Sequence, residues 1–255
     1  FKAQAMARYY RHVPDWLHSN AIAPLVRRLP ARLGYMSTDF LAKQFIRGFP
    51  SHDALRAGHW MHTLSAADVQ ALLKDVSAVK SATTVTNRFL ENIWDESREC
   101  GYLGQLAYRL QRTFLPEYVL CNSDRSAMLN SLELRSPLLD VNVANLANSL
   151  SDSAKMPGLN TKYLLKKVAE RYLPKSLIYR KKMGFTIPMA TLLRTSLKDD
   201  LLSIFSPALV EKQGIFNSNA VQQLLERHLS GKENLYKPIW TLYSLQKWLI
   251  NEGFI

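Results

Sequence analysis

The chain has 255 residues and a formal net charge of +12, from 33 Lys and Arg against 21 Asp and Glu. Because 47% of its residues are hydrophobic and 21% are charged, it can form an apolar core, which excludes a disordered protein. Its length allows one large domain or two small ones. Its two cysteines, Cys100 and Cys121, exclude a disulfide framework. We expect both to be buried or neutral thiols in a reducing compartment, the cytoplasm.

The sequence begins at Phe1 without an initiator methionine. An amphipathic helical pattern is already present in the first eighteen residues and is broken at Pro14. We therefore expect this chain to be a piece of a longer protein. It contains no apolar stretch long enough for a signal peptide or a membrane span.

Helical periodicity dominates the chain and strand-like alternation is scarce, so we predict an all-α fold. In the first part of the chain, the pattern predicts helices at 36–48 and at about 85–97. Between them, within 50–75, Ser65 precedes Asp68 by three residues, which is the signature of a capping box at a helix start.

Further helices are predicted at 101–115, after Asp140, and at 161–173, 189–204, 217–229 and 236–251. We expect Pro116 to end the first of these helices and Asp140 to cap the next. Residues 179–188 contain Gly and Pro without a sustained period, so we predict a loop there. The last helix carries an apolar stripe that we expect to pack in the core, formed by Trp240, Leu245, Trp248 and Leu249.

The basic residues are spread along the chain, and the one compact cluster is Arg180, Lys181 and Lys182. A positive balance of this size is compatible with nucleic acid, an anionic surface, a polyanion such as ATP, or simply solvated charges. A nucleic-acid-binding protein needs a recognition helix or a basic stripe, and no expected helix carries Lys or Arg on one side over three turns. A basic nucleic-acid-binding or partner-binding helical module without activity stays open as an alternative.

Two segments carry an unusual combination of motifs. The first begins at 115–120 (LPEYVL), continues into 123–128 (SDRSAM) and ends with 131–140 (SLELRSPLLD). The second is 180–185 (RKKMGF), which follows a Leu-Pro pair at 173–174. In this order they resemble the synthetase domain of the glutamine-hydrolysing asparagine synthetases. The family pattern is L-P, D-R-x-S-M, E-x-R-x-P-[FL]-L-D, K-x-x-L, L-P and R-x-K-x-G-F.

The resemblance covers about residues 101–250. It implies one helical region over 1–255, with variable helices at 1–100 and a motif-bearing helical core at 101–255. This region is the C-terminal helical part of an α/β adenine-nucleotide α-hydrolase-like synthetase domain, whose parallel sheet we expect upstream of Phe1. The family's S-G-G-x-D-S pyrophosphate loop, its D-E-[LV]-F motif and its N-terminal cysteine glutaminase domain are not found in this sequence.

The family reaction activates a side-chain carboxylate as an acyl-adenylate, releases pyrophosphate, and lets ammonia displace AMP. The resemblance implies ATP with Mg²⁺ as cofactor, bound mainly outside this chain, with glutamine and a small carboxylic acid as further partners. It also implies contact with the upstream sheet and glutaminase domain of the same polypeptide, and it allows a homodimer but no nucleic acid. Aspartate is the default acid, although the residues at Pro137–Leu139 and Met183–Phe185 leave other acids open. We expect the isolated chain to be inactive.

Lys182 falls on the lysine of the R-x-K motif and is our candidate catalytic residue, because a positioned cation stabilises negative charge developing on phosphate or acyl oxygens. Arg180 and Lys181 flank it and suit phosphate binding, with an ordinary basic surface loop as the alternative for Lys181. Glu133 and Arg135 are two residues apart on an extended segment, so both side chains lie on one face and can pair. They either shape the pocket wall or form a structural salt bridge.

Asp124 and Arg125 lie on a helical segment that the resemblance places near the nucleotide cleft. A helix start, an ion pair and a site contact all stay open for them. The six histidines show no pairing with Cys, Ser or acids at useful spacing. His59 and His62 can share a helix face, but two histidines without a third ligand do not indicate a metal site.

Overall fold

A computed structural model of the protein describes residues 6–7, 9–10, 12–30, 37–49, 51–180 and 187–254. Within these residues the fold is helical, and its one β feature is an isolated bridge between Leu73 and Phe216. The predicted all-α fold class is therefore confirmed. The chain divides into two compact units: unit 1 is Phe1–Pro14 with Arg88–Met183, and unit 2 is Asp15–Asn87 with Gly184–Ile255. The predicted division of the chain at residue 100 stays a prediction.

Unit 2 contains an N-terminal group of helices and a C-terminal group. The first group is α2 (Asp15–Leu17), the π-helix η1 (His18–Ile22), α3 (Ala23–Arg27), α4 (Thr38–Arg47), α5 (Asp53–Met61) and α6 (Ala66–Leu72). The second group is α14 (Met189–Leu192), α15 (Lys198–Ile204), α16 (Pro207–Gln213), α17 (Ser218–Leu229) and α18 (Tyr236–Asn251). Helix α7 (Ser77–Glu96) begins in unit 2 and continues into unit 1.

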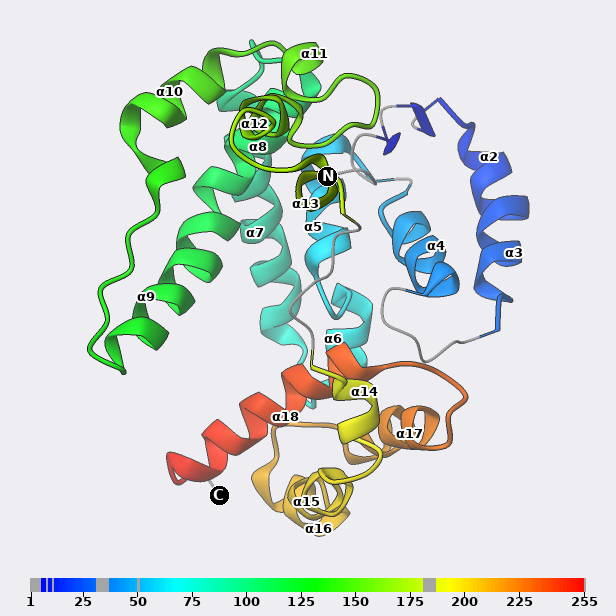
Figure 1. The fold of residues 1–255 in the computed structure, drawn as a ribbon. Coiled ribbons are helices and arrows are strands. Elements are labelled where there is room, and N and C mark those ends of the chain that lie inside the picture. Colours follow the sequence, from blue (N-terminus) through cyan, green and yellow to red (C-terminus); the bar gives the residue numbers. More distant parts are fainter. Residues whose placement is uncertain are drawn as a thin grey trace. The chain divides into compact units, whose positions relative to one another are not determined.

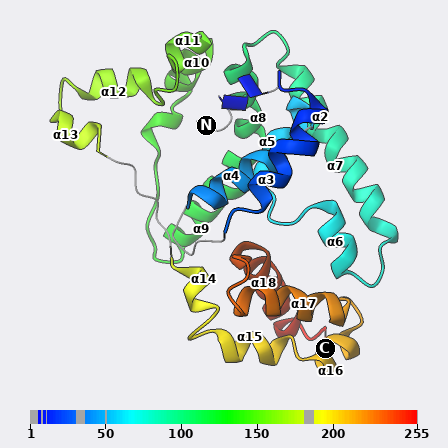
Figure 2. The same ribbon diagram turned by 90° about the vertical axis from the view of Figure 1, so that its right-hand side faces the viewer.

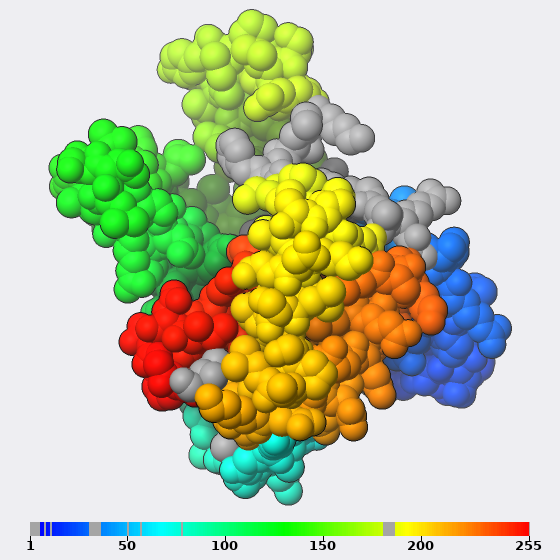
Figure 3. All heavy atoms as spheres, turned by 90° about the horizontal axis from the view of Figure 1, so that it is seen from below, coloured from blue at the N-terminus to red at the C-terminus, as the bar shows by residue number. Residues whose placement is uncertain are grey.

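The core of unit 2 lies among α14 to α18, with Leu72 of α6 added to it. Its most completely buried side chains are Leu193, Leu201, Phe205, Val210, Phe216, Val221, Leu225 and Ile239. Helix α18 contacts α14, α15 and α17. Figure 3 shows α14 to α18, in yellow to red, packed against one another. Because each large apolar side chain gains about 1.5–3 kcal/mol on full burial, this unit has a stabilising core of its own.

Local signals set the helix boundaries in unit 2. Ser65 and Asp68 form the predicted capping box, since the Ser65 hydroxyl accepts the Asp68 N–H at 3.1 Å and the Asp68 carboxylate accepts the Ser65 N–H at 2.8 Å. The Asn217 side chain accepts the N–H of Ala220 at 3.2 Å and caps α17 in the same way. Gly214, with a φ of 73°, provides the left-handed residue that ends α16.

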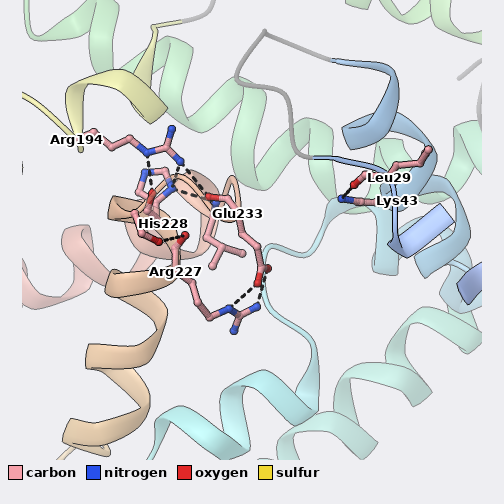
Figure 4. Close-up of polar contacts among 8 residues, drawn as sticks. Leu29, Lys43, Arg194, Arg227, His228 and Glu233 are labelled. Carbon is pink, nitrogen blue, oxygen red and sulfur yellow. Dashed lines mark hydrogen bonds and ion pairs between the residues drawn. The ribbon is translucent and has the colours of Figure 1, made fainter. Parts of the chain in front are cut away.

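A buried polar network closes the end of α17 (Figure 4). His228 is fully buried, and its Nδ1 accepts the backbone N–H of Leu235 at 3.2 Å. The Arg194 side chain donates to the carbonyls of His228 at 2.8 Å and Glu233 at 3.0 Å. Burial, and then the charge of Arg194, lower the pKa of His228 from its ordinary value of 6.5 to about 4. The imidazole of His228 is therefore neutral at pH 7.

We expect unit 2 to lose stability as the pH falls from about 6.5 towards 4, because the unfolded chain then binds a proton at His228 that the folded unit excludes. Because folding lowers the pKa of His228 from 6.5 to about 4, the free energy of unfolding should fall by about 3 kcal/mol over this pH range. Urea unfolding followed by tryptophan fluorescence between pH 7 and 4.5 measures it. His228→Asn keeps a hydrogen-bond acceptor but does not titrate, so the free energy of unfolding should depend less on pH in this variant. His62→Asn, at an exposed histidine of the same unit, should leave this pH dependence unchanged.

From Arg88 onward, unit 1 consists of the C-terminal part of α7 followed by shorter helices. These are α8 (Tyr102–Arg112), the π-helix η2 (Leu115–Leu120), α9 (Cys121–Met128), the 3₁₀-helix η3 (Pro137–Leu139), α10 (Val141–Ser149), α11 (Asp152–Lys155), α12 (Tyr163–Ala169) and α13 (Lys175–Ile178). Figures 1 and 2 show that the chain from η2 to α13 runs as short helices joined by extended connections. Buried side chains of this unit gather on α7 and α8, where they include Leu90, Ile93, Trp94, Leu103 and Leu106.

The carboxylate of Asp152 caps the start of α8, although it lies far along the sequence. Its two oxygens accept the backbone N–H groups of Leu103 at 2.9 Å and Gly104 at 3.1 Å. Gly101, the residue before the helix, has no side chain to do this, and a Cβ there would lie 2.7 Å from the carboxyl carbon of Asp152. The negative charge of Asp152 also lies next to the positive, N-terminal end of the helix dipole, which is a favourable interaction. Asp152 therefore ties the segment after α10 to α8.

We expect Asp152→Ala to lower the free energy of unfolding of unit 1 by about 1–2 kcal/mol, the usual value of a helix cap. Hydrogen exchange reports it locally, because the amides of Leu103 and Gly104 should lose protection. Asp140→Ala is the matched control: it removes another N-cap, so exchange should rise at Asn142 instead. Unchanged protection at residues 103 and 104 in Asp152→Ala would contradict this assignment.

Several predicted helices agree closely with the structure, namely α4, α10, α17 and α18. The predicted cap of α10 is confirmed, since the Asp140 carboxylate accepts the N–H of Asn142 at 2.9 Å. The helix predicted to begin near residue 85 instead begins at Ser77. Its Thr83 and Thr84 hydroxyls donate to carbonyls one turn earlier, at 2.7 and 2.9 Å, so both hydroxyls are satisfied within the helix.

Other predicted boundaries were wrong. The helix at 101–115 ends at Arg112, and Pro116 does not stop a helix but lies in the first turn of η2. The helix at 161–173 is limited to α12. The single helix at 189–204 is two helices, α14 and α15, separated by a turn. Leu193, just after α14, and Leu201 of α15 are both buried in the core. Helix α16 was not predicted.

The prediction of which residues form the buried face of the last helix was also partly wrong. Leu249 is buried as predicted, but Trp240, Leu245 and Trp248 are 40%, 41% and 52% exposed. The buried face of α18 is formed by Ile239, Leu242, Gln246 and Leu249. Packing against α14, α15 and α17 selects this neighbouring stripe of the helix, and the aromatic residues stay outside.

Candidate functional site

The predicted site residues of unit 1 lie along the segment from η2 to Arg180. Asp124 and Arg125 are on α9, and both side chains are exposed. Neither has an ion-pair partner among the described residues. Of the three interpretations left open for them, the helix-start role is excluded, because α9 continues directly from η2 and begins at Cys121.

Glu133 and Arg135 form the predicted ion pair. Ser131, with a φ of 56°, ends α9 and turns the chain into an extended segment. The side chains of Glu133 and Arg135 then point to one side and are 68% and 84% exposed. An ion pair this exposed adds at most about 1 kcal/mol of stability. Its charges are therefore accessible to a ligand or to another protein segment.

The basic cluster is described only in part. Lys181 and Lys182 lie outside the described residues, as does most of the loop predicted at 179–188. Arg180 is described, and it is exposed immediately after α13. The sequence-predicted catalytic residue, Lys182, therefore stays a prediction.

The chain leading to the basic cluster is anchored by a polar network that the sequence did not indicate. The hydroxyl of Tyr179 donates to the Glu170 carboxylate. Lys167 Nζ lies 3.1 Å from the same carboxylate, and Lys166 Nζ lies 5.6 Å from the centre of the Tyr179 ring. The hydrogen bonds from Tyr179 and Lys167 lower the pKa of Glu170, and the bond to Glu170 raises the pKa of Tyr179. The residue before Arg180 is thus held in place.

The same segment exposes many large apolar side chains. Those more than half exposed are Tyr118, Met128, Leu129, Leu132, Leu134, Leu138, Val141, Leu146, Val168, Tyr172, Leu173 and Leu177. Between residues 113 and 180, Met156 is the one buried residue. Exposed apolar surface on this scale is typical of an interaction surface. The segment that carries the motifs therefore has little core of its own.

Other kinds of site were examined in the described part of the chain. No group of three or more His, Cys, Asp or Glu residues there is arranged to hold a metal ion. The rings of His59 and His62 lie 6.4 Å apart, edge to face. Cys100 is exposed, Cys121 is half-buried, and both thiols are free. No described helix is long and apolar enough to cross a membrane.

Comparison with known proteins decides the family. A model of the asparagine synthase family matches residues 4–250. The chain belongs to this family. The resemblance inferred from the motifs is confirmed, and it extends further towards the N-terminus than they do. Membership makes the chain a relative of carbon–nitrogen ligases that use ATP.

The chain is similar to asparagine synthetase (glutamine-hydrolyzing) 1 of Bacillus subtilis, with 30% identity over 177 residues, which are 69% of this chain and 27% of that protein. Putative glutamine-hydrolyzing asparagine synthetases of Mycobacterium bovis and Mycobacterium tuberculosis are 31% identical over 138 residues, 53% of this chain and 21% of theirs. The chain thus spans between 21% and 27% of these curated relatives. No solved structure matches it.

We expect Glu170→Gln to loosen the chain before the basic cluster, because it weakens the acceptor that holds Tyr179. Limited trypsin digestion at Arg180 should become faster by about threefold to tenfold, the range expected for the loss of one ordinary, solvent-exposed hydrogen bond. Glu133→Gln removes a different exposed ion pair and should leave cleavage at Arg180 unchanged. Equal cleavage rates in the two variants would show that Glu170 does not anchor this part of the chain.

Proposed function

We propose that this chain is the C-terminal helical part of an ATP-dependent amidotransferase that converts a carboxylate into an amide with ammonia from glutamine. Aspartate is the default substrate, and the protein acts in the cytoplasm. The observation that carries this proposal is the asparagine synthase match over residues 4–250. The motifs at 115–140 and 173–185 support it, since they occur in the family's order.

In this proposal the chain contributes positive charge to the reaction. ATP, with Mg²⁺ bound mainly outside this chain, activates the carboxylate by adenylation. Lys182, flanked by Arg180 and Lys181, stabilises the negative charge that builds up on phosphate and acyl oxygens, because a preorganised cation needs no reorganisation when charge develops. The bond from Tyr179 to Glu170 supports this role, since it anchors the chain just before the cluster.

The remaining predicted site residues shape the substrate pocket and support the nucleotide side of the site. Glu133 and Arg135 shape the wall of the substrate pocket as a pair and perform no bond chemistry. Asp124 and Arg125 support the nucleotide side of the site from α9.

The exposed apolar segment binds the rest of the synthetase. We propose that it packs against the nucleotide-binding sheet of the same polypeptide, beside a glutaminase domain, and the assembly can form a homodimer. Two observations support this: the relatives are about four times as long as the part they share with this chain, and residues 113–180 bury little but Met156. The same surface favours a second candidate function, a partner-binding module without activity.

The 255-residue chain alone should release no pyrophosphate from ATP in the presence of Mg²⁺, aspartate and either glutamine or ammonia.

In the polypeptide that contains this chain, Lys182→Ala should lower kcat about 10²–10³-fold, the usual loss for one preorganised charge-stabilising group. Lys198→Ala, at an exposed lysine of α15, is the control and should keep full activity. Unchanged kcat in Lys182→Ala would remove Lys182 from the mechanism. An inactive parent polypeptide would favour the partner-binding module.

A further inference from the structure

Unit 2 contains a hollow of about 610 Å³ that is lined mainly by cations. Its charged residues are Arg27, Arg28, Lys43, Arg47, Lys232 and Glu233. They come from three places in the fold: the end of α3, the last two turns of α4, and the turn after α17. None of them belongs to the motif-bearing segment, so the hollow does not depend on the proposed function.

The one acidic residue of the lining does not neutralise this charge. Both oxygens of Glu233 are already engaged by Arg227, at 2.7 Å each (Figure 4), and Arg227 is not part of the lining. Arg47 lies 3.9 Å from the Asp68 carboxylate, which is the long limit of an ion pair. Among the described residues, Arg27, Arg28 and Lys232 have no side-chain partner. The hollow therefore carries an excess of positive charge.

Three hydrogen bonds, drawn in Figure 4, hold the segments that line the hollow. Lys43 Nζ donates to the carbonyl of Leu29 at 2.7 Å and so ties α4 to the chain after α3. Arg194 donates to the carbonyls of His228 and Glu233 and so holds the turn that carries Lys232. The positive charges are thus mounted on connections that are already held before any ligand arrives, which reduces the entropy lost on binding.

Lys237, a neighbouring lysine, is half-buried and lies close enough to Arg47 to feel its charge. Burial, and then the charge of Arg47, lower the pKa of Lys237. Lys237 also lies over the ring of Phe40, with its Nζ 5.1 Å from the ring centre, which links α18 to α4. An anion placed in the hollow would reduce the repulsion between these cations.

We propose that this hollow binds an oligophosphate anion, of the pyrophosphate or triphosphate kind, through the side chains of Arg27, Arg28, Lys43, Arg47 and Lys232. Guanidinium groups form bidentate hydrogen bonds with phosphate oxygens, and ammonium groups attract the anion as point charges. Among the described residues, the lining holds no aromatic ring on which a base could stack, so we expect the phosphates to carry the recognition. The volume falls in the range of small-ligand sites, about 300–1,000 Å³.

Calorimetric titration of the 255-residue chain with inorganic pyrophosphate at low ionic strength tests the site. The triple variant Arg27→Gln, Arg28→Gln and Lys232→Gln removes three charges that make no side-chain contact with described residues. We expect its affinity for pyrophosphate to fall at least tenfold, because each lost charge-assisted contact weakens binding. Far-UV circular dichroism should show the wild-type helix content in the variant.

A second triple variant is the matched control. Lys74→Gln, Lys198→Gln and Lys212→Gln change the net charge by the same amount at exposed positions of unit 2 outside the hollow. Its affinity for pyrophosphate should change less than twofold. Equal losses in the two triple variants would overturn the proposal, because binding would then follow net charge alone. Wild-type affinity for pyrophosphate no greater than for sulfate would overturn it as well. ATP binding as tightly as pyrophosphate would support recognition through the phosphates.

Discussion

The arrangement of the motif-bearing segment depends on one carboxylate, that of Asp152, at the start of α8. Apolar burial contributes little there, since Leu103 and Met156 form the small cluster beside it and few other side chains of the segment are buried. Hydrogen bonds made by polar side chains therefore hold this segment together more than apolar packing does. Gln111 and Asn148 add a second tie, between α8 and α10, at 2.9 Å. Lys155 of α11 adds a third, since its ammonium donates to the Asn148 carbonyl of α10. Polar ties fix positions but supply little net free energy, so the segment has little stability of its own.

The largest apolar core and most of the family motifs lie in different units. Unit 2 has a continuous core over α14 to α18, while unit 1 carries the asparagine synthase motifs on a surface with exposed apolar side chains. The exposed pair of Glu133 and Arg135 fits this organisation, because charges that add little to stability are free to contact a substrate.

Elements set by neighbouring residues could be predicted from the sequence, and elements set by distant residues could not. The capping box of Ser65, the cap at Asp140 and the pairing of Glu133 with Arg135 all depend on spacings of two or three residues. The cap that Asp152 provides for α8 joins residues 48 and 49 apart, and no local pattern announces it. The exposed face of α18 was missed for a related reason, since tertiary packing chose among several apolar stripes of one helix. The family was accessible because its motifs are short and ordered along the chain.

The π-helix η2 has a consequence for the face that α9 presents. It continues into α9 without a break, so the chain from Leu115 to Met128 is one helical rod with a wider turn at its start. A π-turn accommodates an extra residue in the helical ladder, and each residue in an α-helix rotates the following ones by about 100°. The angular position of Asp124 and Arg125 is therefore set by the wide turn. A homologue with one residue fewer in this turn would present a different side of the rod at the same place, although its D-R motif would be intact.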